Sequence, residues 1–361
     1  HYWWFIISLL GALLVFLLFV QGANSMIFQL GKTEEERRML INSTGRKWEF
    51  TFTTLVTFGG AFFASFPLFY STSFGGAYWV WVLILFTFII QAISYEFQNK
   101  AGNLFGVRTF QTGLIINGIL GPLLLGGAVA TFFTGSNFIV EKGNITDFMQ
   151  PVISHWANGS RGLDVLLNPW VVIFGISVVF LARILGTLYI NNNVNDDIIR
   201  GRVRKQLLVN TVLFLLFFLP FLIVTLVGEG YAVNEAGVIV MEPMKYLNNL
   251  LAMWPLAIIL LVGVVLLLFG IVKTVLKPEY VRGVWPAGIG VVLVVLVLFL
   301  IAGWNNTAYY PSTAELQSSL TLKNSSSSEF TLKAMFYVSF LVPFVLAYIV
   351  YAWRAIDKKA I

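Results

Sequence analysis

Few residues of this chain could carry chemistry, and the most suggestive of them surround Glu49. Glu49 follows Trp48 at the start of an apolar block, and Thr53 comes four residues later. Helical spacing places Glu49 and Thr53 on one helix face, so that an acid leads into a row of hydroxyl groups. One interpretation is that this face passes protons inward with the help of water. The other is that Glu49 is a helix-end acid favoured by the helix dipole.

Two further charges lie within or beside apolar blocks. Arg183 is in the middle of one, where an ionisable residue indicates either a functional site or a structural pairing across helices. Glu96 closes another block between Tyr95 and Phe97, a position that favours an interfacial anchor over a proton carrier. We keep both as candidate sites after Glu49.

Residues that bind metals and haem are scarce. The chain has no Cys and only two His, namely His1 and His155 in a polar link. This excludes thiolate metal sites and a bis-histidine haem within the membrane for this chain alone. The sequence also has no Walker A motif, so an ATP-driven pump is excluded. We therefore expect no catalytic, cofactor-binding or metal-binding residue here, and any redox centre must belong to a partner.

Membrane-crossing helices must position these residues. Hydrophobic residues make up 58% of the 361 and charged residues 11%, with a mean hydropathy of +0.83. A bilayer core needs about 20 apolar residues in helical form. This predicts an all-α polytopic membrane protein with a single transmembrane domain over residues 1–361. Its nine spans lie at roughly 3–28, 51–70, 77–95, 108–133, 168–191, 206–228, 249–272, 284–304 and 333–353.

The basic residues predict the orientation. Of the 23 Lys and Arg residues, 17 lie on one side of the nine blocks, among them Arg354, Lys358 and Lys359, and five lie on the other side. Cytoplasmic loops carry the excess of Lys and Arg, so we expect the N-terminus outside and the C-terminus inside. The net charge of +6 has the same origin and gives no reason to expect nucleic acid as a partner. The first block lacks a preceding basic segment, so we expect slight trimming of the initiator Met but no cleaved signal.

Several short motifs follow one another along the whole chain. They are Glu36-Arg37-Arg38 with Ile41-Asn42-Ser43, Trp48-Glu49, Gly59-Gly60-Ala61-Phe62-Phe63-Ala64-Ser65-Phe66-Pro67, Tyr95-Glu96-Phe97, Leu167-Asn168-Pro169 and Ser319-Leu320-Thr321. In this order they resemble subunit II of the cytochrome bd quinol oxidases. Each motif alone is weak, but the ordered set is specific. The resemblance implies two four-helix bundles plus one peripheral helix.

The resemblance also implies a function. Subunit II of that family binds no haem and pairs, about a pseudo-twofold axis, with subunit I. Subunit I carries two b-type haems and haem d, oxidises quinol and reduces oxygen to water in the bacterial inner membrane. Subunit II supports it and is implicated in delivering cytoplasmic protons, so the complex builds proton-motive force without a pump. A structural quinone or lipid and small single-helix accessory subunits are also compatible with the family.

The chain departs from this family at several positions. Two acids common at the end of the first helix are amides here, Gln21 and Asn24. An Arg often found before the aromatic triplet is replaced by Gln91, and the acid after Trp48 is Glu49 where Asp is usual. These changes leave Glu49 as the main candidate for proton uptake.

Two other interpretations stay open. A secondary transporter also has many spans, but it usually has discontinuous helices and paired half-repeats, which the sequence does not indicate. A purely structural membrane scaffold would need no proton pathway at all. An absorbance spectrum of the purified native complex separates these classes, because a co-purifying larger chain with haem bands indicates the oxidase.

Overall fold

The computed structural model describes residues 1–358, and Lys359 of the basic C-terminal end lies outside them. The α-helices are α1 (Tyr2–Leu17), α2 (Phe19–Asn24), α3 (Ile27–Leu30), α4 (Glu34–Gly45), α5 (Trp48–Ser65), α6 (Pro67–Phe69), α7 (Tyr78–Phe97), α8 (Val107–Thr134), α9 (Pro169–Asn193), α10 (Asp197–Val227), α11 (Lys245–Ala252), α12 (Trp254–Leu276), α13 (Val284–Gly303), α14 (Leu322–Ser325), α15 (Glu329–Ser339) and α16 (Val342–Lys358). A π-helix, η1 (Tyr70–Gly76), follows α6.

The structure has between seven and nine candidate spans, a range that includes the nine predicted from the sequence. Within residues 1–358, seven helices are long and apolar enough to cross a membrane, and two bent pairs raise that number to as many as nine. One bent pair joins the α4–α5 run to Pro67–Gly76, and the other joins α15 to α16. The prediction of a polytopic helical membrane protein is therefore confirmed, with nine as the upper count of its spans.

The second span ends earlier than predicted. The chain bends by 119° between Ser65 and Pro67, so residues up to 70 do not continue α5. Pro67 lacks a backbone N–H and starts a new helical turn, which is where a proline is tolerated. A discontinuous helix is thus present, contrary to the expectation from the sequence.

Two other boundaries differ from the predicted blocks. α10 begins at Asp197, where the Asp196 side chain accepts a hydrogen bond from the Ile199 N–H at 2.8 Å. The basic run from Arg200 to Lys205 therefore lies on a helix and not in a link. The seventh block is divided, because α11 ends at Ala252 and α12 starts at Trp254.

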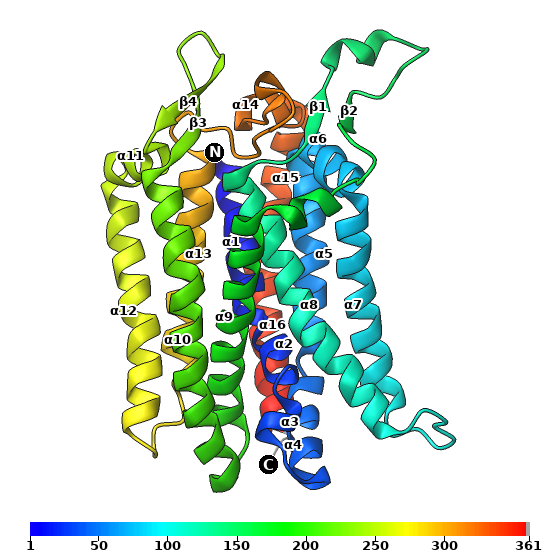
Figure 1. Ribbon diagram of the computed structural model, residues 1–361, viewed down its shortest axis with the longest axis vertical. Helices are drawn as coiled ribbons and strands as arrows, with labels where there is room; N and C mark the ends of the chain where they lie inside the picture. Colours follow the sequence, from blue (N-terminus) through cyan, green and yellow to red (C-terminus); the bar gives the residue numbers. More distant parts are fainter. Residues whose placement is uncertain (359–361) are drawn as a thin grey trace.

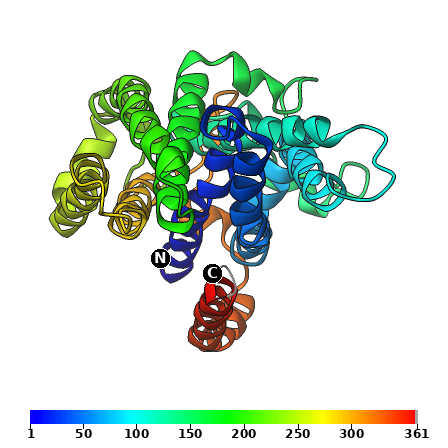
Figure 2. The same ribbon diagram turned by 90° about the horizontal axis from the view of Figure 1, so that it is seen from below.

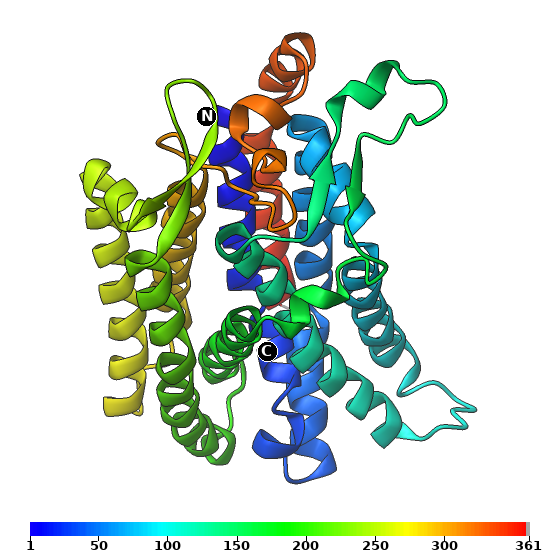
Figure 3. The ribbon, with the colours of Figure 1, turned by 45° about the horizontal axis from the view of Figure 1, so that its top comes forward.

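The longer polar links contain strands that the all-α prediction did not include. β1 (Phe138–Val140) pairs with β2 (Ser154–Trp156), and β3 (Glu229–Val233) pairs with β4 (Ile239–Pro243), both antiparallel. The two hairpins lie at the end of the molecule where the N-terminus is found, as Figures 1 and 3 show. They cover one end of the helices and leave the helical class unchanged.

The helices surround a central pair, α1 and α2. α1 packs against α5 and α13, while α2 packs against α8 and α9. Seen from below, α10, α12 and α13 lie on one side and α5 and α7 on the other, while α15 and α16 stand apart (Figure 2). The Trp353 ring of α16 reaches the bundle at Phe50, with 5.3 Å between the ring centroids.

The α2–α9 contact is a contact between backbones. A Cβ atom added to Gly22 would lie 1.7 Å from the carbonyl oxygen of Ala182. On the opposite helix, a Cβ on Gly186 would lie 2.3 Å from the Ala23 nitrogen. Small residues allow membrane helices to approach this closely, because packing drives their association. This contact holds the end of the first span, with Gln21 and Asn24, in the middle of the protein.

Candidate functional site

Glu49 begins the outward face of α5. Glu49, Thr53 and Thr57 are exposed, whereas Thr51 and Leu55 between them are buried. The Thr53 hydroxyl donates to the backbone oxygen of Glu49, and the Thr57 hydroxyl donates to that of Thr53 at 2.8 Å. The acid and the hydroxyl groups therefore share one face, with the hydroxyl protons engaged by the helix backbone.

Trp48, the residue before Glu49, points inward. Its ring stacks on that of Tyr95, with centroids 6.0 Å apart and planes 21° from parallel. Adjacent residues of a helix are about 100° apart around its axis, so Glu49 points in a different direction from Trp48. The structure places Trp48 against the protein and Glu49 on the outside.

A buried cluster of neutral polar side chains lies behind Trp48, and we call Gln21, Thr87, Gln91 and Asn117 the amide cluster. Gln21 Nε2 donates to Gln91 Oε1 and to Asn117 Oδ1, both at 3.3 Å, and Asn117 Nδ2 donates to Thr87 Oγ1 at 3.4 Å. All four side chains are buried. Gln21 Oε1 and Gln91 Nε2 have no hydrogen-bond partner among residues 1–358.

A second polar group continues toward the α4 end of the molecule. Asn24 Nδ2 donates to the Tyr95 hydroxyl at 2.8 Å, and that hydroxyl donates to Thr44 Oγ1 at 2.9 Å. The Thr44 hydroxyl donates back to Asn24 Oδ1 at 3.0 Å, which closes a ring of three. These groups and the amide cluster contain no carboxylate and no cation.

Positions where the chain departs from the resembling family therefore meet in space. Gln21, Asn24 and Gln91 come from α2 and α7 and lie in these two polar groups. The sequence reasoning missed Thr44, Thr87 and Asn117. Thr87 and Asn117 could have been identified from the sequence as candidates for contacts between helices, because each is an isolated polar residue inside an apolar block.

The other two candidate charges have partners of their own. Arg183 on α9 donates through Nη2 to Gln29 Oε1 on α3, and its guanidinium carbon lies 5.9 Å from the Phe180 ring centroid. Glu96 pairs with Lys100 one turn further on, at 2.7 Å, and both are exposed. An exposed i,i+4 pair contributes little stability, so Glu96 fits a helix-end anchor.

The described residues contain no group of three or more His, Cys, Asp or Glu that could hold a metal ion. His155 is exposed on β2, opposite Ile139.

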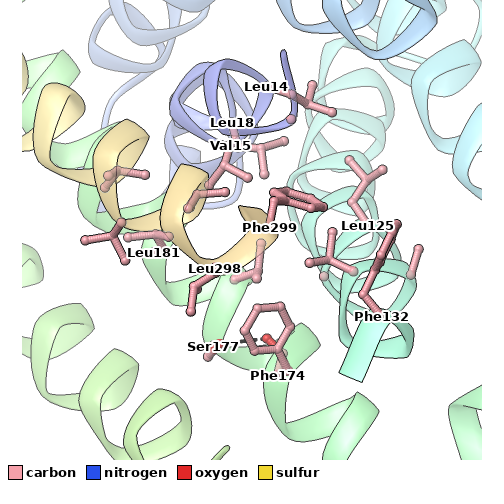
Figure 4. A pocket seen from close by; sticks show the side chains of 18 of the residues that line it. Leu14, Val15, Leu18, Leu125, Phe132, Phe174, Ser177, Leu181, Leu298 and Phe299 are labelled. Atoms are coloured by element: carbon pink, nitrogen blue, oxygen red, sulfur yellow. Dashed lines mark hydrogen bonds between the residues drawn. The ribbon is translucent and has the colours of Figure 1, made fainter. Parts of the chain in front are cut away.

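An apolar cavity of about 90 Å³ lies at the centre of the helices. Residues of α1, α8, α9 and α13 line it, and Figure 4 shows Leu18, Leu125, Phe174 and Phe299 around it. Ser177 is at its edge, but its hydroxyl donates to the Phe174 backbone oxygen at 2.7 Å. The lining of the cavity therefore suits an apolar hydrocarbon chain and gives a polar group few hydrogen-bond partners.

These features define a multi-pass membrane protein with a neutral polar interior, and comparison with known proteins gives its family. The family model for cytochrome bd terminal oxidase subunit II matches residues 1–356. A cytochrome bd-I ubiquinol oxidase subunit 2 from Escherichia coli (strain K12) is 26% identical, over 99% of this chain and 94% of its own length. A cytochrome bd ubiquinol oxidase subunit 2 from Bacillus subtilis (strain 168) is 23% identical, over 99% of this chain and 96% of its own length.

A solved structure has the same fold. It is the bd oxidase from Geobacillus thermodenitrificans, of which one chain superposes with a TM-score of 0.62 at 12% identity, over 98% of this chain and 96% of that one. The chain belongs to the cytochrome bd terminal oxidase subunit II family. It is thus a subunit of a membrane oxidase of respiratory electron transport, as the ordered motifs predicted.

Proposed function

We propose that this chain is the haem-free subunit of a quinol:oxygen oxidoreductase and pairs with a haem-bearing subunit I. Its named relatives are subunits of ubiquinol oxidases, which supports quinol as the substrate of the complex. The two b-type haems and haem d belong to subunit I, which reduces oxygen to water. The helices can be grouped as α1, α5, α7, α8 and as α9, α10, α12, α13, with the two groups packed together through α1–α13 and α8–α9 and with α15–α16 apart. This grouping supports two four-helix bundles plus a peripheral helix.

Glu49 is the cytoplasmic mouth of the proton pathway in this proposal, and Thr53 is its next step. The observation that carries it is the outward face of α5, where Glu49, Thr53 and Thr57 follow one another. Trp48 closes the inward side by stacking on Tyr95. Protons entering at Glu49 therefore run along the outside of this chain, between it and subunit I, and not through the amide cluster.

Replacing Glu49 tests this pathway. Glu49→Gln removes the titrating group while keeping the side-chain shape, so we expect oxygen reduction by the complex to slow by about tenfold. Glu49→Asp should be milder, because the family commonly has Asp there. Glu96→Gln is the matched control, since Glu96 is an exposed acid already paired with Lys100. If the assembled Glu49→Gln complex turns over at the parental rate across a range of pH, Glu49 carries no protons, and this chain would act only as a scaffold.

The haem-free proposal has a separate test. His155 is exposed on β2, and the only other histidine is His1. We expect His155→Ala to leave every haem band of the complex unchanged in the reduced-minus-oxidised spectrum. Loss of one band in a fully assembled complex would contradict this.

The proposed orientation places the N-terminus outside and the C-terminus in the cytoplasm. The N-terminus and the last turns of α16 lie toward opposite ends of the molecule in Figure 1, as an odd number of spans requires. We expect a phosphatase reporter fused to the C-terminus to be inactive and a fluorescent reporter there to be bright. The reverse pattern would show that the orientation is opposite to the one proposed and that Glu49 lies at the outer surface of the membrane.

Lipophilic ligands and small partners complete the proposal. The apolar cavity supports a structural quinone tail or a lipid chain at the centre of the helices. The exposed outer side chains of α15 and α16, such as Phe336 and Phe344, support contact with membrane lipid or a single-helix accessory subunit. The discontinuity at Pro67 is a feature shared with transporters, but no half-repeat accompanies it in the sequence.

A further inference from the structure

A small pocket beside the β1–β2 hairpin brings four hydroxyl groups together. Its volume is about 20 Å³, and the hydroxyl-bearing residues that line it are Ser73, Thr131, Ser136 and Tyr310. They come from four segments of the chain: η1, α8, the link between α8 and β1, and the link between α13 and α14. All four residues are buried, with exposed fractions between 2% and 5%. Hydroxyl groups buried in this way require hydrogen-bond partners inside the protein.

The direct hydrogen bonds of these hydroxyl groups use only part of their capacity. Thr131 Oγ1 donates to a backbone oxygen of its own helix at 2.6 Å, an interaction that does not use its lone pairs. Ser73 Oγ accepts from Trp81 Nε1 at 3.3 Å, an interaction that does not use the Ser73 proton. The Tyr310 hydroxyl lies close to the other three side chains. Ser136 Oγ is nevertheless without a direct hydrogen-bond partner among residues 1–358.

One water molecule matches both the volume of the pocket and its hydrogen-bonding groups. A cavity needs about 10–15 Å³ of this kind of volume to hold a water molecule, which then needs two to four polar partners. A water molecule donates two hydrogen bonds and accepts two, so it can donate to Thr131 Oγ1 and accept from the Ser73 hydroxyl. Two of its hydrogen bonds then remain for Ser136 and Tyr310. The other lining residues are Gly or apolar, and none of the lining residues is charged, so the pocket does not suit an ion.

We propose that this pocket binds one resident water molecule, which hydrogen-bonds to Ser73, Thr131, Ser136 and Tyr310. The water joins η1 to α8 and to two of the links at the hairpin end of the molecule. η1 follows the break at Pro67 and packs against β2, and Figure 1 shows α6, which η1 follows, next to the β1–β2 hairpin. A water that bridges groups unable to bond one another directly is costly to remove. The site therefore fixes the π-helical segment after Pro67 against the hairpin.

Ser136→Ala and Tyr310→Phe test the site through the midpoint of thermal inactivation of the purified two-subunit complex. If water is bound, each change removes one of its partners, so we expect the midpoint to fall by about 2 °C for each variant. If the pocket is dry, Ser136→Ala removes a buried hydroxyl without a partner, and the midpoint should stay the same or rise. Ser65→Ala is the matched control, because Ser65 Oγ is equally buried and unpartnered among residues 1–358 but does not line this pocket. It should not lower the midpoint.

An electron cryomicroscopy map of the complex that resolves ordered water provides a second, direct measurement. We expect one peak about 2.7–3.2 Å from both Ser136 Oγ and the Tyr310 hydroxyl, and its loss in the Ser136→Ala/Tyr310→Phe double variant.

Four outcomes would overturn the proposal. The first is a map that shows other buried waters but no peak here, and the second is an unchanged or raised midpoint for Ser136→Ala. The third is an equal fall of the midpoint for Ser65→Ala, which would show that the effect is not specific to the pocket. The fourth is elongated density that continues into the central apolar cavity, which shares Ser73 and Trp81 with the pocket, because a lipophilic molecule would then occupy the site. Both readouts are independent of the Glu49 pathway and of oxygen reduction.

Discussion

Gln21→Asp alone is expected to destabilise the complex severely. The Gln21 amide is fully buried, with Nε2 3.3 Å from both Gln91 Oε1 and Asn117 Oδ1. A carboxylate there would have no cation beside it, and an uncompensated buried charge costs about 3–5 kcal/mol. Gln91→Arg alone should be similarly harmful, because it buries a cation among neutral amides.

The double variant should recover much of that loss. The resemblance to the family implies an acid at position 21 and an arginine at position 91, and the structure brings these two side chains into contact. An acid and an arginine at these two positions would form an ion pair where this chain has an amide pair. We therefore expect a coupling of about 2–3 kcal/mol in favour of Gln21→Asp/Gln91→Arg over the sum of the single changes.

The measurement is the midpoint of thermal inactivation of the purified complex, together with its yield. Asn99→Asp is the control, because it adds the same charge at an exposed position at the end of α7. If both single variants match the parental midpoint, the amide cluster is hydrated enough to hold a charge. If the double variant is no better than the worse single variant, the two positions did not change as a pair.

Gly22→Ala is the second change with a large expected effect, namely loss of most of the assembled complex. Its Cβ would lie 1.7 Å from the Ala182 carbonyl oxygen, so two helix backbones must separate. Overpacking of this kind costs about 3 kcal/mol or more, because neither backbone can turn aside as a flexible side chain could. Moving α2 from α9 would also displace Gln21 and Asn24 from their hydrogen bonds.

Gly201→Ala is the matched control for this test. Gly201 is also helical, on α10, but an added Cβ meets nothing within 4 Å. Its replacement should leave assembly intact or stabilise the helix by about 1 kcal/mol. Both variants are compared by the amount of haem-loaded complex recovered from membranes. Normal recovery of Gly22→Ala would mean that α2 and α9 pack less closely in the complex than in the isolated chain.

The outward position of Glu49 has a consequence for the complex. In the proposed pathway, the outer face of α5 is enclosed only when subunit I covers it, so we expect proton delivery to depend on assembly. The amide cluster behind Trp48 cannot replace it by titration, since Gln21, Gln91 and Asn117 are neutral at all relevant pH values. Disruption of the subunit contact and Glu49→Gln should therefore impair the same step.

The sequence by itself determined the class, the approximate positions of most apolar helices and the family of this protein. A membrane helix must satisfy its backbone hydrogen bonds within its own segment, so a span can be recognised from local composition alone. The block at 284–304, for example, matches α13 (Val284–Gly303) closely. Pro67 could have indicated the break in the helix, but the apolar residues continue on both sides of it, and the bend of 119° was therefore not predicted.

Only the tertiary structure decided which polar residues meet. Gln21 and Gln91 are 70 residues apart, and Arg183 and Gln29 are 154 apart, so no local pattern could pair them. The sequence also could not decide which of Trp48 and Glu49 points toward the protein interior. Helical spacing gives the angle between two adjacent side chains but not the direction in which either points. Contacts of this kind depend on how helices cross, and that is set by close approaches such as Gly22 on Ala182.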